Sequence, residues 1–208
     1  MILINTIKNR IQVVVKYINY MIFSNLFVFI VFFLSCGTTK KGKPMKYKFD
    51  FVTSYSQFYL TSDHGDKSIE DNTSYPDDND LEDRLYIEEK FITIYAGSYG
   101  HIRGELFVLD KANPNIEYEL YDHVAEGGLD VETGELQILH CPTSAVEFKV
   151  KVKPGIYRVR VLFSKLYTNQ LDEFEGDDRY RIEVWPDNNI EKKVLKRYKL
   201  PWMHKNDE

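Results

Sequence analysis

The chain has 208 residues, with 27 basic and 32 acidic side chains. Every acidic side chain follows residue 49, so residues 50–208 carry 19 basic and 32 acidic side chains and a net charge of −13. An acidic domain repels phosphate backbones, which excludes nucleic acid as the expected partner and leaves room for a basic protein. The 159 residues after position 49 are enough for one domain with a single core.

An apolar segment of 14 residues, 21–34, lies near the start of the chain. As a helix it would span about 21 Å, less than the roughly 30 Å of a bilayer's hydrocarbon core. Lys8, Arg10 and Lys16 precede it and supply the positive charge that is typical of an export signal. The segment therefore predicts a cleaved signal peptide, and the alternative is an uncleaved signal anchor at residues 18–35. Both interpretations place the rest of the chain across a membrane.

The end of this segment, Phe33-Leu34-Ser35-Cys36, resembles the lipobox of bacterial lipoproteins. The resemblance implies that Cys36 is lipidated and becomes the mature N-terminus, which attaches the protein to a membrane. We therefore expect a signal peptide at 1–35, a flexible tether at 36–46 and a β-sandwich domain at 47–208. The expected location is the bacterial cell envelope, at the outer membrane or the cell surface. No cofactor is expected, and Cys141 has no second cysteine with which to form a disulfide.

The first half of the domain predicts strands separated by one long loop. Residues 47–60 alternate aromatic and polar side chains, which predicts a strand with a break near Ser54. Residues 61–83 are polar and acidic, which predicts a loop. Further strands are predicted for the β-branched and aromatic runs at 86–96 and 101–109.

The second half continues this pattern. Residues 122–131 and 135–140 flank Glu132-Thr133-Gly134, which predicts a hairpin. Further strands are predicted at 146–152, 157–163 and 180–184, with an edge strand within 191–200. Nine or ten short strands with turns between them and no helical period predict an all-β fold, an antiparallel β-sandwich or jelly roll in a single domain.

The strands at 157–163 and 180–184 are expected at the centre of the sandwich. The predicted inward side chains are those of Tyr157, Val159, Val161, Tyr180, Ile182 and Val184. The predicted solvent-facing side chains are those of Arg158, Arg160, Arg179 and Arg181. In this register Val159→Ala should cost about 1–3 kcal/mol of stability. Arg158→Ala should cost less than about 1 kcal/mol, because only exposed ion pairs are lost.

Two acidic clusters are candidate sites. Asp78, Asp80, Glu82 and Glu89 occupy positions 1, 3, 5 and 12 of a calcium-binding loop. Asp83 stands where that loop needs glycine, so a solvated acidic loop is the preferred interpretation. A second cluster surrounds Gly176. The expected interaction surface consists of Asp77, Asp83, Asp172, Glu175, Asp177 and Asp178.

Asp122, His123 and Glu126 could suggest acid–base chemistry. On a strand, however, residues three apart face opposite sides, so His123 and Glu126 should not converge. The preferred interpretation is structural, with Asp122 or His123 fastening a loop. The remaining histidines lack the spacing of a zinc site, and no nucleophile elbow is present.

Three segments together resemble a family of uncharacterised bacterial β-sandwich proteins. They are DHVAEGGLDVETG at 122–134, KPGIYRVRV at 153–161 and GDDRYRIEVWP at 176–186. More distantly, SYSQFYL at 54–60 is similar to the opening of the competence protein ComJ, a nuclease inhibitor. The resemblance implies a β-sandwich and permits an inhibitory role, and it carries over no catalytic residues.

These observations favour a membrane-anchored, monomeric lipoprotein whose β-sandwich is a non-catalytic binding module rather than an enzyme. One alternative is an inhibitor or immunity protein that neutralises a basic nuclease or toxin. The other is a hydrolase of envelope glycans or peptides. That hydrolase would be favoured if Trp185, Tyr99, Asp177 and Asp178 lined one cleft.

Overall fold

The computed structural model describes residues 44–62, 77–88, 90–143, 145–166 and 176–198. The chain divides into two units, Met1–Lys41 and Gly42–Glu208, and all of the described residues belong to the second. The predicted signal peptide and Cys36 therefore lie outside the described residues. Within the described part, no helix has both the length and the apolar character needed to cross a membrane.

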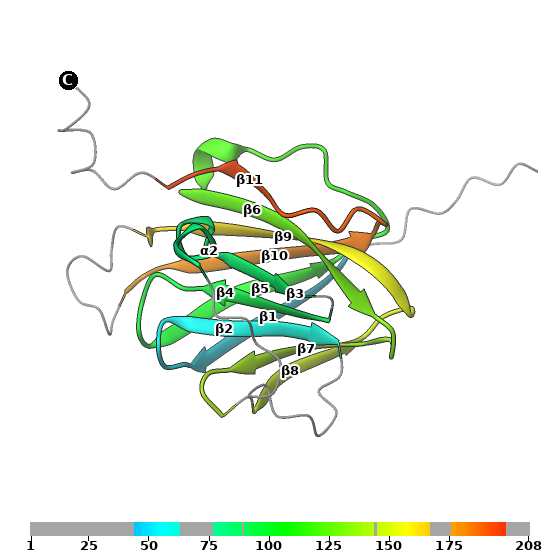
Figure 1. Ribbon diagram of the computed structural model, residues 1–208, viewed down its shortest axis with the longest axis horizontal. Helices are drawn as coiled ribbons and strands as arrows, with labels where there is room; N and C mark the ends of the chain where they lie inside the picture. Colours follow the sequence, from blue (N-terminus) through cyan, green and yellow to red (C-terminus); the bar gives the residue numbers. More distant parts are fainter. Residues whose placement is uncertain (1–43, 63–76, 89, 144, 167–175, 199–208) are drawn as a thin grey trace, which may run out of the picture. The chain divides into compact units, whose positions relative to one another are not determined.

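Two β-sheets form the described body (Figure 1). The six-stranded sheet contains, in spatial order, β1 (Met45–Val52), β5 (His101–Val108), β10 (Arg179–Pro186), β9 (Gly155–Ser164), β6 (His123–Val131) and β11 (Lys193–Lys196). The five-stranded sheet contains β3 (Leu85–Glu88), β4 (Phe91–Tyr95), β2 (Gln57–Ser62), β7 (Glu135–His140) and β8 (Val146–Lys151). A short helix α2 (Asp78–Asp83) and a 3₁₀ turn η2 (Tyr118–Leu120) complete the described elements.

The prediction of an all-β, mainly antiparallel fold is confirmed. The paired strands are antiparallel except β5 and β10, which run parallel. That parallel pair was not predicted, because it joins segments far apart in the chain. Strand β1 begins at Met45, so it includes the last two residues of the predicted tether. Strand β11 is the predicted edge strand.

Two predicted elements differ from the structure near β2 and β4. The expected break near Ser54 is the point where the chain passes from one sheet to the other, through Tyr55 and Ser56 with φ values of 58° and 49°. The run predicted as one strand at 86–96 is a hairpin of β3 and β4. Its turn around Lys90 contains no glycine or proline, so propensity alone could not separate the two strands.

The hairpin predicted around Glu132-Thr133-Gly134 is wrong, because β6 and β7 belong to different sheets. Gly134 adopts a φ of +73°, and a Cβ at this position would lie 2.9 Å from the Val152 carbonyl oxygen. The Val152 N–H in turn donates to the Gly134 carbonyl at 2.9 Å. Glycine is therefore needed so that this crossing can pack directly against the neighbouring crossing from β8 to β9.

The central pair β9 and β10 has the predicted inward register. The six residues expected to face inward are all buried. Aromatic rings from both sheets meet between them, since Tyr180 of β10 contacts Phe58 of β2 and Phe163 of β9 edge-to-face, with centroids 5.3 and 5.6 Å apart. Such contacts add to the stabilisation from apolar burial. The core of the sandwich is therefore centred on this pair of strands.

The outward side of the same strands differs from the prediction, because Arg158 and Arg160 are buried. Arg158 contacts the carboxylate of Glu126 at 3.1 Å, and Arg160 binds the same carboxylate. Arg160 also contacts Glu183 at 3.2 Å, and Arg181 contacts Glu183 at 2.7 Å. We call this row of alternating charges, Arg158, Glu126, Arg160, Glu183 and Arg181, the charge ladder. It crosses β6, β9 and β10 on the outer face of the six-stranded sheet.

Two connecting segments cover the charge ladder. Arg160 donates to the Asn113 carbonyl at 3.1 Å, and Arg158 donates to the Asn189 carbonyl at 3.1 Å. The second segment approaches the sheet so closely that a Cβ at Gly128 would lie 2.3 Å from the Ile190 Cα. Strand alternation reveals which residues share a face and cannot reveal which segment covers it. The prediction of exposed arginines failed for that reason.

From the sequence, Arg158→Ala should lower the free energy of unfolding by less than about 1 kcal/mol. The structure raises this expected loss to about 3 kcal/mol, because the substitution leaves part of the buried Glu126 carboxylate unpaired. Arg179→Ala is the matched control on the same face, since its side chain is 39% exposed where that of Arg158 is 4% exposed. The control should cost less than about 1 kcal/mol. Urea titrations measure both values. Equal costs would contradict the burial of Arg158.

Candidate functional site

The first predicted acidic loop contains helix α2. Asp77 caps the helix, because its carboxylate accepts the Asp80 N–H at 2.8 Å while the Asp80 carboxylate accepts the Asp77 N–H at 3.1 Å. These bonds satisfy two backbone N–H groups that a helix start leaves unpaired. The hydrogen bond from the Asp80 N–H lowers the pKa of Asp77. The sequence analysis predicted a loop here and missed this helix, although Asp77 followed by an acidic residue three positions later is a capping-box pattern.

The inner side of α2 is fastened to the C-terminal part of the chain. Lys192 donates to Asp80 at 2.6 Å and to Asp83 at 2.9 Å, and Arg197 also donates to Asp83. Burial opposes ionisation of Asp83, but the hydrogen bonds from these two cations outweigh it and lower the pKa of Asp83. Asp83 is buried, so the prediction that it belongs to an interaction surface is wrong. Its carboxylate holds the helix in place.

The four predicted calcium ligands are not brought together in the described residues. Asp78, Asp80 and Glu82 lie on α2, where Asp80 binds Lys192 and Glu82 contacts Arg197 at 3.4 Å. Glu89 lies outside the described residues. Among the residues that the structure describes, no three histidine, cysteine or acidic side chains form a group that could hold a metal ion.

The second acidic cluster separates into an exposed and a buried residue. Asp177 is exposed and contacts Arg179 at 3.1 Å. Asp178 is fully buried, where it accepts hydrogen bonds from the Ser98 hydroxyl at 2.6 Å and from the Tyr180 hydroxyl. Burial raises the pKa of Tyr180 well above its usual value, and the charge of Asp178 raises it further. Asp178 therefore ties the loop after β4 to β10, and its prediction as a surface residue is wrong. The predicted residues Asp172 and Glu175 lie outside the described residues.

His123 and Asp122 have the structural role that was predicted. The His123 ring accepts the Tyr198 N–H at Nδ1, at 3.2 Å, while Nε2 lies 2.8 Å from the Asp83 carbonyl oxygen. This geometry requires a neutral ring with its proton on Nε2. Asp122 fixes the end of β9 by accepting the Leu166 N–H at 2.8 Å. As expected, Glu126 faces the other side of the sheet, in the charge ladder.

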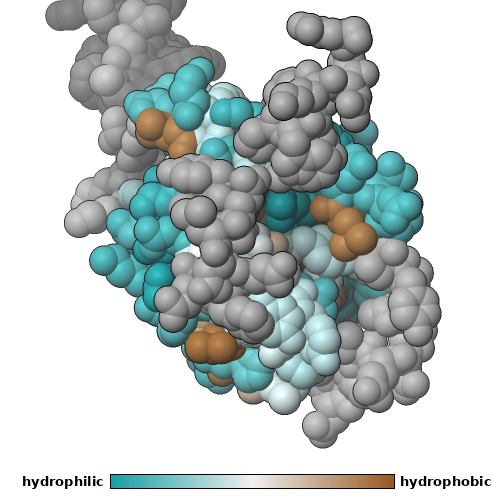
Figure 2. All heavy atoms as spheres, turned by 90° about the vertical axis from the view of Figure 1, so that its left-hand side faces the viewer, coloured by the Kyte–Doolittle hydropathy of each residue, from teal (hydrophilic) through white to brown (hydrophobic). Residues whose placement is uncertain are grey.

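What remains exposed on α2 is a small acidic surface. It consists of Asp77, Asp78, Leu81 and Glu82, which we call the acidic corner. Leu81 is 50% exposed among the three carboxylates. Figure 2 looks onto the end of the sandwich near which α2 lies, and its coloured surface is mostly hydrophilic with small, separate hydrophobic patches. The corner therefore combines negative charge with one apolar side chain on a fixed backbone.

The residues proposed for a hydrolase cleft do not share one. Trp185 is buried beneath the segments that cover the charge ladder, where the Arg160 guanidinium lies 4.9 Å from its ring centroid. Asp178 is buried inside the sandwich. Neither side chain is available to line a cleft with Tyr99 and Asp177.

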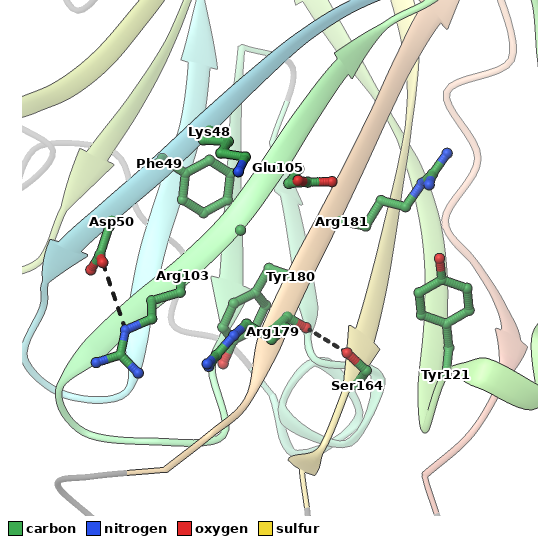
Figure 3. Close-up of a pocket in the computed structure, with 11 residues that line it drawn as sticks. Lys48, Phe49, Asp50, Arg103, Glu105, Tyr121, Ser164, Arg179, Tyr180 and Arg181 are labelled. Carbon is green, nitrogen blue, oxygen red and sulfur yellow. Dashed lines mark hydrogen bonds and ion pairs between the residues drawn. The ribbon is translucent and has the colours of Figure 1, made fainter.

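A shallow pocket of about 520 Å³ lies on the outer face of the six-stranded sheet, beside the charge ladder. Figure 3 shows its lining, which comes mainly from the adjacent strands β1, β5 and β10. The charged side chains in the lining are Lys48, Asp50, Arg103, Glu105, Arg179 and Arg181. Sequence reasoning missed this basic pocket. The alternation of side chains in β1 and β5 could be recognised in the sequence. The pairing of β5 with β10, which brings the lining residues together, could not.

The His123 geometry predicts a pH dependence of stability. Burial lowers the pKa of His123 to about 4, and the charges of Arg84 and Arg197 also lower it. The hydrogen bond to the Asp83 carbonyl opposes this shift. The unfolded chain binds a proton near pH 6.5 and the folded chain near pH 4, so stability falls as pH drops between these values, by about 3 kcal/mol in total. Above pH 6.5 the contribution is constant.

Urea titrations across this range measure the slope, with His123→Leu as the comparison. The variant is less stable at every pH, but its curve should lack the part of the slope that His123 supplies, while the slope from the carboxylates remains. Identical slopes in the two proteins would mean that the pKa of His123 is the same in the folded and unfolded states, which would contradict this account.

No protein-family model matches the chain, and no curated protein sequence matches it. The wider family of bacterial β-sandwich proteins therefore remains a prediction. Among solved structures, the chain is similar to the crystal structure of ComJ, inhibitor of the DNA degrading activity of NucA, from Bacillus subtilis. That likeness has a TM-score of 0.50 at 16% identity and covers 71% of this chain and 98% of ComJ.

A second similar structure is described as crocagin biosynthetic gene J, with a TM-score of 0.47 and 16% identity over 70% of this chain and 99% of that one. At these identities the comparisons show the fold alone. The likeness to ComJ that residues 54–60 suggested is confirmed at that level, and the chain has a ComJ-like fold.

Proposed function

We propose that this protein is a membrane-anchored, non-catalytic inhibitor that binds a basic nuclease. The observation that carries the proposal is the shared architecture with ComJ, which extends over 98% of that nuclease inhibitor. A similar sandwich is present here, with a strongly acidic composition. A nuclease must attract phosphates, so its active face is basic and complementary to an acidic inhibitor.

The acidic corner is the contact surface in this proposal. Asp78 and Glu82 are exposed, and Leu81 between them supplies apolar area that a partner can bury. Lys192 and Arg197 hold the helix from behind through Asp80 and Asp83. A surface that is already ordered loses little conformational entropy on binding, which favours affinity. The proposal therefore keeps the predicted basic partner. Of the predicted interaction surface it keeps Asp77, and it adds Leu81 and two residues that were predicted as metal ligands, Asp78 and Glu82.

The envelope hydrolase is the less favoured alternative. It required Trp185, Tyr99, Asp177 and Asp178 in one cleft, and two of these side chains are buried in separate places. No comparable arrangement supports a second function among the described residues.

The proposed location is the cell envelope, with Cys36 as the lipid attachment site of a monomeric protein. The apolar segment at 21–34 and the Ser35-Cys36 junction support this proposal. A fatty-acid analogue supplied to growing cells should label the wild-type protein and leave Cys36→Ala unlabelled. Equal labelling of the two proteins would contradict lipidation at Cys36.

Purified NucA provides the test of the inhibitory function, with DNA degradation as the measurement. The protein should suppress degradation when added in stoichiometric amounts. Glu82→Lys should raise the concentration needed for inhibition about tenfold, because it places a positive charge against a basic partner.

Glu132→Lys is the matched control, since Glu82 and Glu132 have exposed fractions of 69% and 68% and each contacts one cation. It should inhibit as well as the wild type. Undiminished DNA degradation in the presence of the wild-type protein would contradict the nuclease-inhibitor function. If both substitutions raised the concentration needed for inhibition equally, α2 would not be part of the contact surface.

A further inference from the structure

Beside the charge ladder, the outer face of the six-stranded sheet has the opposite charge to the rest of the domain. Its outward charged side chains on β1, β5 and β10 are Lys46, Lys48, Asp50, Arg103, Glu105, Arg179 and Arg181, which we call the basic face. Five of these seven are cationic, whereas residues 44–208 carry 21 basic and 32 acidic side chains. Figure 3 shows all of them except Lys46, and they come from three adjacent strands. The basic face is therefore a positively charged surface on a negatively charged domain.

The pairs on this face leave positive charge in excess. Glu105 contacts Lys46 at 2.9 Å, and Asp50 contacts Arg103 at 3.7 Å. Arg179 is paired with Asp177 at the edge of the face, and Arg181 is paired with Glu183 of the charge ladder at 2.7 Å. Lys48 lies within ion-pair distance of no carboxylate in the described residues, although it is exposed at the centre of β1. The face therefore offers cationic groups to an external anionic surface.

The short connection between Cys36 and β1 limits how far the domain can lie from the expected lipid. Strand β1 is an edge strand of the six-stranded sheet and the first element of the domain. Residues 37–44 separate it from Cys36, and eight residues span at most roughly 28 Å when fully extended. Lys40, Lys41 and Lys43 add three further cations along this tether. A domain held this close to a bilayer contacts the lipid headgroups. When those headgroups are anionic, electrostatic attraction favours contact through the basic face.

We propose that the basic face docks on anionic lipid headgroups and orients the domain on the membrane. This inference rests on the proposed lipid attachment at Cys36. Docking uses β1, β5 and β10, while α2 contributes no residue to the pocket on this face. The acidic corner is thereby left available to a protein partner. An acidic membrane would repel that corner, so the two charged surfaces specify one orientation together.

The test uses the full, processed chain in vesicles of phosphatidylcholine alone or mixed with phosphatidylglycerol. An amine-reactive reagent labels the lysines, and mass spectrometry measures the extent at Lys48. Lys149 is the matched control, because it is exposed on β8, an edge strand of the other sheet. On the anionic vesicles, labelling of Lys48 should fall about threefold and recover at high salt, because screening removes the attraction. Labelling of Lys149 should not change.

The double substitution Arg103→Gln with Arg179→Gln should weaken this protection without affecting flotation of the protein with the vesicles. Flotation with Lys48 labelled equally on both vesicle types would overturn the docking and leave the lipid anchor intact. Failure of the wild type to float would overturn the anchor and the docking together, while inhibition of NucA would be unaffected. Protection of Lys48 by duplex DNA and not by anionic vesicles would also overturn the proposal.

Discussion

The buried ion pair between Arg158 and Glu126 is the constraint on which the outer half of the structure depends. A charged pair on an uncovered sheet contributes little, because water screens it. Here both side chains are buried, so each charge must be matched by hydrogen bonds. Arg158 finds further acceptors in the Asn189 and Glu191 carbonyls. The segment that buries the Arg158 charge is therefore the same segment that supplies its further hydrogen-bond acceptors.

That segment continues directly into the elements that position α2. Lys192 follows it, and Arg197 lies just beyond β11. Together they bind Asp80 and Asp83 from behind. His123 completes the junction by bridging the Asp83 carbonyl and the Tyr198 N–H. The segment that covers the charge ladder is therefore joined to the acidic corner by covalent neighbours and hydrogen bonds. These connections explain how a helix of only six residues keeps a defined position.

The sequence predicted the sandwich because strands such as β9 and β10 alternate strictly, and burial of Val159 and Ile182 follows from that alternation. It did not predict that Arg158 is buried, because the cover comes from a segment about 30 positions away. Acidic clusters were the least informative signal. Asp77, Asp83 and Asp178 look alike in the sequence, yet one caps a helix, one binds two cations and one anchors a loop. Only the three-dimensional partners distinguish these carboxylates from the exposed Asp78 and Glu82.

In the proposed function, α2 is the surface through which this protein binds a nuclease. Hydrogen–deuterium exchange of the full chain, measured with and without NucA, tests this role of α2. The amides of residues 78–84 should exchange more slowly in the complex, while those of β8, on the edge of the other sheet, should not change. Inhibition of NucA with unchanged exchange at α2 and new protection elsewhere would contradict it.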